Sequence, residues 1–166
     1  MAQTHVAGAG GNWSDVAQWT SRVPLPQDDV NVDGTTTGTL TADMPRLGHS
    51  IDFTGFAGTC AFNSTATSVF GSITLASGMT VSGTQVMTLG GRGVFTLTSA
   101  GKSYTQAITL NANSSTYNLA DALTTAGALT LTAGVLAARG NTLTYGSLVQ
   151  TAGILALWPS AFFISA

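Results

Sequence analysis

The chain has seven carboxylate side chains, all from aspartate, and two of them are adjacent. Asp28 and Asp29 stand together, and Asp33 follows four residues later. Hard oxygen ligands on a turn suit Ca²⁺, but that ion takes about six to eight ligands and this neighbourhood supplies few. Asx-type hydrogen bonding around Pro26 and Gly34 explains the same cluster without an ion. We therefore expect no metal site and no cofactor.

A pair of carboxylates is also what glycoside cleavage requires, one as the acid and one as the base or nucleophile. After Gly71 the only carboxylate belongs to Asp121. A single carboxylate cannot perform this chemistry unless a neighbouring subunit supplies the second. We therefore expect no catalytic residue and no enzymatic activity.

The other reactive side chains are isolated. His5 and His49 lack a second metal-binding residue at ligand spacing. Cys60 is the only cysteine and lies in an apolar run, so the sequence predicts a small buried hydrophobe. The glycine-rich run 90–93 lacks the Lys-Ser/Thr of a P-loop and is interpreted as a tight turn.

Three tyrosines offer a different chemistry, which is stacking against sugar rings. Tyr104, Tyr117 and Tyr145 stand singly along the expected strands, on a chain rich in Thr, Ser and Asn. The same spacing is typical of partly buried core or interface residues. Glycan binding is therefore kept as the second hypothesis.

Composition excludes other classes of function. Charged residues make up 7% of the chain, and the five basic residues are scattered singly, so we expect no nucleic-acid partner. No apolar run approaches the roughly 20 residues that cross a bilayer, so we expect no membrane insertion. Residues 1–5 lack the basic start and apolar stretch of a signal peptide.

The spacing of glycines predicts the fold class. From residue 71 to residue 157 glycines recur about every six or seven residues, followed by alternating apolar and Thr/Ser positions. Because strand side chains alternate between faces, Leu129 and Leu131 can enter a core while Thr130 faces water. Helix-forming residues are scarce. The pattern predicts an all-β chain of short strands that bend at glycines.

An internal similarity refines this prediction. Residues 71–90 can be laid on residues 127–146 at an offset of 56, which places Ile73 on Leu129. Such self-similarity is typical of solenoids, although chance matches are easy in a chain rich in Gly, Thr and Leu. We expect a short parallel β-solenoid or β-helix with a capped N-terminal end; a β-sandwich or jelly roll is the alternative.

The expected organisation is a single domain. Residues 1–11 are expected to be a flexible N-terminal arm, and residues 12–153 a single β-rich repeat domain. Trp13 and Trp19 are expected to cover the N-terminal end of the stack, with one helical turn between them capped by Ser14 or Asp15.

Residues 154–166 form an apolar C-terminal segment that is too short to span a membrane. It either docks on a neighbouring molecule or folds back as a cap. The side chains expected to make these contacts are Trp158, Phe162, Phe163 and Ile164.

The order of these motifs resembles a known class of protein. The run Gly11-Asn12-Trp13-Ser14-Asp15 with Trp19 is followed by Pro26-Gln27-Asp28-Asp29-Val30, and then by the glycine-bounded strands at 51–59, 71–78 and 129–134. Together they resemble β-solenoid virion structural proteins of tailed bacteriophages, of the tail-fibre, spike or capsid-decoration type. The opening is also similar to that of bacterial surface β-helices, which carry export signals.

The resemblance implies a non-enzymatic structural protein of a tailed-phage virion surface, either a capsid decoration or cement protein or a tail-associated component. It would be made in the host cytoplasm and would reside in the virion. Its implied partners are identical copies, as a homotrimer, and other virion proteins such as the capsid or tail. The alternative is a receptor- or glycan-binding module of a tail fibre or bacterial surface adhesin, whose partner is a host-surface glycan.

Overall fold

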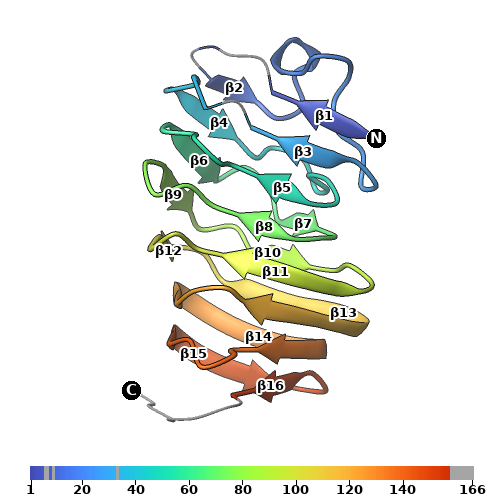
Figure 1. Cartoon of the computed structure of the whole chain (residues 1–166), viewed down its shortest axis with the longest axis vertical. Coiled ribbons are helices and arrows are strands. Elements are labelled where there is room, and N and C mark those ends of the chain that lie inside the picture. The colour runs from blue at the N-terminus through green and yellow to red at the C-terminus, as the bar shows by residue number, and fades with distance from the viewer. Residues whose placement is uncertain (6–7, 9, 33, 158–166) are drawn as a thin grey trace.

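The computed structural model describes residues 1–5, 8, 10–32 and 34–157. Stacked parallel strands form a β-solenoid of about six turns (Figure 1). This confirms the expected all-β solenoid and rules out the sandwich alternative, because the neighbouring strands are parallel. Among the described residues, no helix is both long and apolar enough to cross a membrane.

The strands form three columns along the stack. The first column contains β1 (Ala2–Thr4), β3 (Asp29–Asn31), β5 (Ile51–Asp52), β8 (Ile73–Thr74), β11 (Val94–Thr98), the later part of β13 (Ile108–Leu119), the end of β14 (Leu123–Ala137) and β16 (Ile154–Ala156).

The second column begins with β2 (Gly10–Asn12), β4 (Thr39–Thr41), β6 (Thr59–Phe62) and β9 (Thr80–Gly83), and continues with β12 (Ser103–Tyr104) and the first parts of β14 and β15 (Leu143–Gln150). The third column contains β7 (Thr67–Val69), β10 (Met87–Leu89), the start of β13, the middle of β14 and the end of β15. The long strands β13, β14 and β15 therefore each turn a corner and contribute to two or three columns.

The strand registers fix the length of one coil. Met87, Ile108 and Leu129 are successive register partners, 21 residues apart. Ile73 instead pairs with Leu97 and belongs to a different column from Leu129. The predicted repeat at an offset of 56 is therefore wrong: the glycine spacing marks one side of the coil, about seven residues, and 56 residues span about eight sides rather than a whole number of coils.

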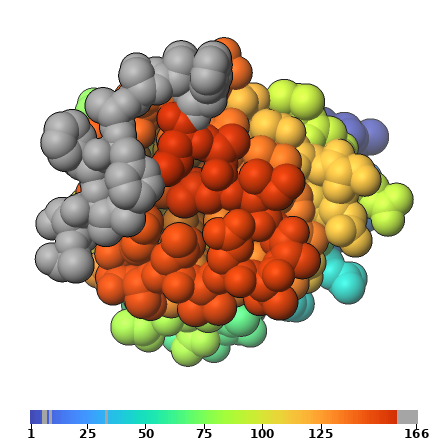
Figure 2. Space-filling view, turned by 90° about the horizontal axis from the view of Figure 1, so that it is seen from below, coloured from blue at the N-terminus to red at the C-terminus, as the bar shows by residue number. Residues whose placement is uncertain are grey.

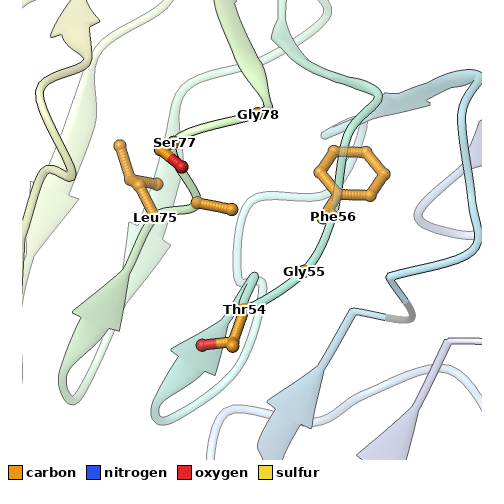
Figure 3. Close-up of a pocket in the computed structure, with 7 residues that line it drawn as sticks. Thr54, Gly55, Phe56, Leu75, Ser77 and Gly78 are labelled. Carbon is orange, nitrogen blue, oxygen red and sulfur yellow. The ribbon is translucent and has the colours of Figure 1, made fainter.

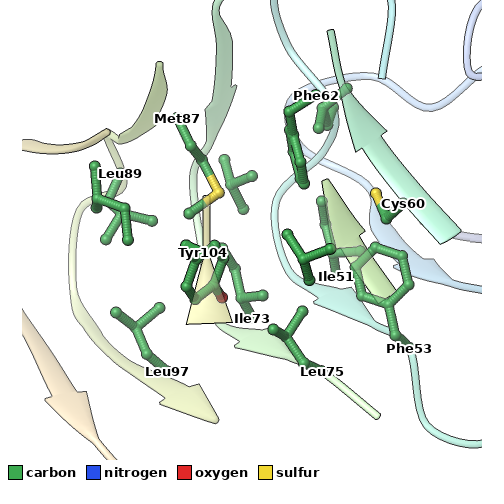
Figure 4. Packing of buried hydrophobic residues seen from close by; sticks show 14 of the residues in the cluster. Ile51, Phe53, Cys60, Phe62, Ile73, Leu75, Met87, Leu89, Leu97 and Tyr104 are labelled. Carbon is green, nitrogen blue, oxygen red and sulfur yellow. The ribbon is translucent and has the colours of Figure 1, made fainter. Parts of the chain in front are cut away.

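Inward-facing side chains from all three columns meet in one core. Figure 4 shows Cys60 and Phe62 of the second column facing Ile51 and Ile73 of the first, with Met87 of the third beside them. All five are at most 5% exposed. Fully burying one large aliphatic or aromatic side chain stabilises a protein by about 1.5–3 kcal/mol, so these rows supply the main cohesion of the stack.

The N-terminal end of the stack is closed by aromatic side chains. Trp13 is 0% and Trp19 4% exposed, and their ring centroids lie 4.8 Å apart. The indole N–H of Trp13 donates to the carbonyl of Leu47 at 3.1 Å, and that of Trp19 to the carbonyl of Trp13 at 2.8 Å. Between them a short 3₁₀ turn, η1 (Val16–Gln18), is capped by Asp15, whose carboxylate accepts from the Ala17 N–H. The two rings therefore lie where an N-terminal cap requires them.

Two expected boundaries differ from the structure. Residues 1–11 are not simply a flexible arm, because β1 pairs with β3, β2 pairs with β4, and the Gln3 side chain is fully buried. The solenoid also continues beyond residue 153, since β16 pairs with β14. The predicted contact residues Trp158, Phe162, Phe163 and Ile164 lie outside the described residues.

Candidate functional site

The aspartates, which are the chain's only acidic residues, serve the turns of the solenoid. Each of the six described carboxylates accepts a hydrogen bond from a backbone N–H. The donors are at Ala17 for Asp15, Leu25 for Asp28, Ser50 for Asp29, Ser14 for Asp43, Thr54 for Asp52, and Ser99 and Ala100 for Asp121. Three of these acceptors, Asp29, Asp43 and Asp121, bond to a residue about one coil away. The carboxylates therefore tie turns and coils together.

Asp121 illustrates this role. Its carboxylate oxygens accept from the backbone N–H groups of Ser99 at 2.7 Å and Ala100 at 2.6 Å. Ala100 has a φ of +50°, a conformation that is strained for a side-chain-bearing residue. The carboxylate holds this strained turn in place, and no second described carboxylate is paired with it for acid–base cleavage.

Asp28 is buried, at 1% exposed, and is bound by a cation. Arg22 contacts both of its carboxylate oxygens, with a distance of 3.0 Å from Nη2 to Oδ1, and the Leu25 N–H donates to Oδ2 at 2.8 Å. The hydrogen bonds from Arg22 hold the pKa of Asp28 below its ordinary value, against the opposing effect of burial. The cluster thus forms a salt-bridged loop at the N-terminal end, and its third member, Asp33, lies outside the described residues.

This ion pair predicts a specific acid sensitivity. Because the folded pKa of Asp28 lies below the unfolded value of about 3.9, the pair stabilises the fold above that pH and its contribution is lost as pH falls through the folded pKa. We expect Asp28→Asn to be destabilised at pH 7 and to lose less further stability than wild type between pH 5 and pH 2. Urea unfolding across that range measures both effects.

The exposed Asp15→Asn serves as the matched control, because that carboxylate accepts from one backbone N–H and faces solvent. An acid limb of equal steepness in wild type and Asp28→Asn would contradict the assigned role of the pair.

The tyrosines and the cysteine are mostly core residues. Tyr104 is 2% and Tyr117 0% exposed, so neither can stack on a sugar in this structure. Burial raises the pKa of the Tyr117 hydroxyl to about 12, and this hydroxyl accepts a hydrogen bond from the Gly91 N–H. Tyr145 is half-buried against the core. Burial likewise raises the pKa of the Cys60 thiol to about 12, which confirms the predicted buried, unreactive cysteine.

Two shallow hollows lie on the surface, and one of them carries no reactive groups. A pocket of about 370 Å³ lies between residues 54–56 and 75–78 on consecutive coils (Figure 3). The hydroxyls of Thr54 and Ser77 are the only polar side-chain groups among its lining residues. None of the described residues that line it has a titratable side chain, so the pocket offers shape without chemistry.

The second hollow, which we call the corner groove, has a volume of about 420 Å³ and gathers residues from four different coils. It is lined by Pro26, Gln27, His49, Phe70, Gly90, Gly91 and Arg92. Sequence reasoning considered His49 and the glycine run 90–93 separately and interpreted neither as part of a site. Only the coil register of about 21 residues brings them together.

The imidazole of the corner groove is held by a carboxylate. His49 Nδ1 lies 2.9 Å from Asp29 Oδ1, and this hydrogen bond lowers the pKa of Asp29. The ring also packs edge-on against Phe95, with centroids 5.6 Å apart. Among the described residues the second nitrogen, Nε2, has no hydrogen-bond partner, so it is available to a ligand.

The last described rung contrasts with the closed N-terminal end. We call β15, β16 and Leu157 the C-terminal rung; both strands pair only with β14 (Figures 1 and 2). Leu148 continues the inward row of Leu129, yet it is 37% exposed where Leu129 is 0% exposed. Val149 and Ile154 are 49% and 55% exposed. One strand edge and part of an inward apolar row are therefore uncovered in the described structure.

Comparisons with known proteins add no family assignment. No protein-family model matches the sequence, and neither the curated proteins nor the solved structures give a match. None of these comparisons links the chain to virion proteins of bacteriophages. What is established is the fold: this chain is a parallel β-solenoid with a closed N-terminal end.

Proposed function

We propose that this chain is a non-enzymatic structural protein of a tailed-phage virion surface, which assembles with identical copies through its C-terminal rung. The observation that carries the proposal is the difference between the two ends of the solenoid. The N-terminal end is closed by Trp13 and Trp19, whereas the C-terminal rung leaves a strand edge unpaired and an apolar row exposed.

An uncovered parallel edge is an adhesive surface. Its unpaired N–H and C=O groups form a template for another strand, and proteins that avoid such pairing place Lys or Pro there. The C-terminal rung has no Lys, Arg or Pro, and its exposed side chains include Leu148, Val149 and Ile154. Burying these groups against another copy is favourable because apolar area leaves water and backbone groups gain partners.

The closed N-terminal end determines the type of assembly. Head-to-tail stacking needs an open edge at both ends, and Trp13 and Trp19 occupy one of them. The C-terminal rungs of different copies therefore meet each other, which produces a closed oligomer rather than a fibre. The trimer and the virion location rest on the resemblance of the sequence to phage β-solenoids.

The use of the aspartates supports a structural rather than catalytic role. All six described carboxylates are engaged in turns, in ties between coils or in the Asp28–Arg22 ion pair. Stiffness then follows from the continuous backbone ladders, and cohesion from the apolar rows.

A pair of edge variants tests the assembly. We expect the wild-type chain to form a stable oligomer by light scattering across dilution, and Val149→Lys and Ile154→Lys to be monomeric with unchanged far-UV circular dichroism. A lysine on a strand edge opposes pairing because its charge must be desolvated. Removing residues 158–166 is expected to abolish assembly as well.

Val94→Lys is the matched control, because Val94 is 75% exposed but lies in β11, in the middle of the stack. This variant should remain oligomeric. A wild-type monomer at every concentration, or lysine variants as oligomeric as wild type, would contradict assembly through the C-terminal rung. A more strongly oligomeric truncated chain would instead identify residues 158–166 as the cover of that rung.

A further inference from the structure

The corner groove has an aromatic floor that two glycines leave open. A Cβ atom on Gly90 would lie 3.3 Å from Cε1 of Phe70, and one on Gly91 would lie 1.9 Å from the Phe70 carbonyl oxygen. Gly91 is therefore required by the close approach of the coils. Gly90 is different, because any side chain there would pack on the half-buried Phe70 ring. Its absence keeps that ring accessible from the groove.

The rim of the groove is polar and carries one cation. Arg92 is exposed, and no carboxylate of the described residues lies within ion-pair distance of it. The amide of Gln27 and the imidazole of His49 also border the groove. Asp29 fixes the orientation of His49 through Nδ1, which leaves Nε2 as the nitrogen that can contact a ligand.

These groups together define a class of ligand. A guanidinium recognises a carboxylate through paired hydrogen bonds. An accessible ring beside Pro26 suits a flat apolar surface, and Gln27 with His49 suits hydroxyl groups. Hydroxyl groups, one apolar face and a carboxylate occur together in a uronic acid.

We propose that the corner groove binds a hexuronate unit of an acidic polysaccharide. The sugar ring lies on Phe70, its carboxylate bonds to Arg92, and its hydroxyls bond to Gln27 and His49. This role goes beyond assembly and does not depend on it, because the corner groove lies on residues 26–92, away from the C-terminal rung.

Titration of the ¹⁵N-labelled full chain with sodium glucuronate tests the proposal. We expect amide shifts that saturate and are centred on residues 26–27, 49, 70 and 90–92. Glucose, which lacks the carboxylate, and acetate, which lacks the ring, should bind much more weakly. Arg92→Gln should weaken glucuronate binding at least about tenfold, because it removes a charged hydrogen bond.

Two further variants separate recognition from folding. Arg139→Gln removes another exposed arginine, in the turn between β14 and β15, and should leave affinity unchanged. Gly90→Val should weaken binding by covering Phe70 while the amide spectrum stays folded. Failure of glucuronate to shift these amides, equal binding of acetate or glucose, or unchanged affinity in Arg92→Gln would each overturn the proposal.

Discussion

Replacing Trp13 with alanine is expected to lower the free energy of unfolding by about 3–5 kcal/mol. The ring is completely buried and packs on Trp19 at the end of the stack, so its loss opens a large cavity above the first coils. It also leaves the Leu47 carbonyl without its indole donor. Urea unfolding monitored by far-UV circular dichroism measures the change.

Trp13→Phe separates the two causes. Phenylalanine keeps most of the aromatic volume but cannot donate to Leu47, so we expect a smaller loss, with about 1 kcal/mol of it from the hydrogen bond. If the alanine variant unfolded at the same urea concentration as wild type, the Trp13 ring would not be acting as a cap.

The second large effect is expected at Gly83, where consecutive coils approach most closely. Gly83 has a φ of +115°, and a Cβ atom there would lie 2.2 Å from the carbonyl oxygen of Phe62, its register partner in β6. Gly83→Ala therefore combines backbone strain with a clash against a backbone atom. We expect it to lower the free energy of unfolding by about 3 kcal/mol or more.

Two other glycines separate strain from clash. Gly101 has a φ of +74° but open space around its Cβ position, so Gly101→Ala should cost only about 1–2 kcal/mol. Gly127 has no such φ, yet a Cβ atom there would lie 2.5 Å from the Ala107 nitrogen. Equal stability of Gly83→Ala and Gly101→Ala would show that coil contact contributes nothing at Gly83.

The local features of this fold could be predicted from the sequence. Alternation at residues 129–131 gave the strand, Asp15 was one of two expected caps for the helical turn, and the apolar run around Cys60 predicted burial. Each depends on a few neighbouring residues, whose side-chain periodicity reports directly on a strand or turn.

The coil register could not be predicted in the same way. Glycine spacing reports the side of a coil, and three similar sides make an offset of 56 as plausible to the eye as a true coil repeat of about 21. Only backbone pairing decides which side stacks on which. For the same reason the corner groove was missed, since Gln27, His49, Phe70 and Arg92 are local to nothing but the stack.

Residues 2–4 show how tertiary structure overrides composition. The segment is short and lies next to a glycine-rich stretch, which is typical of a mobile arm. In the structure β3 provides a ready ladder for Ala2–Thr4, and Gln3 becomes fully buried. A strand without strong propensity is thus formed by its neighbour.

The 21-residue spacing of Met87, Ile108 and Leu129 makes the length of this molecule a quantity that changes in steps. Duplicating the segment that starts at Ile108 and stops before Leu129 adds one coil, extends the stack by about 4.8 Å and leaves every later side chain on its own face. An insertion of half that size within a strand would turn every later apolar row toward the wrong side. Lineages carrying this architecture can therefore lengthen or shorten as a ruler does, by whole divisions.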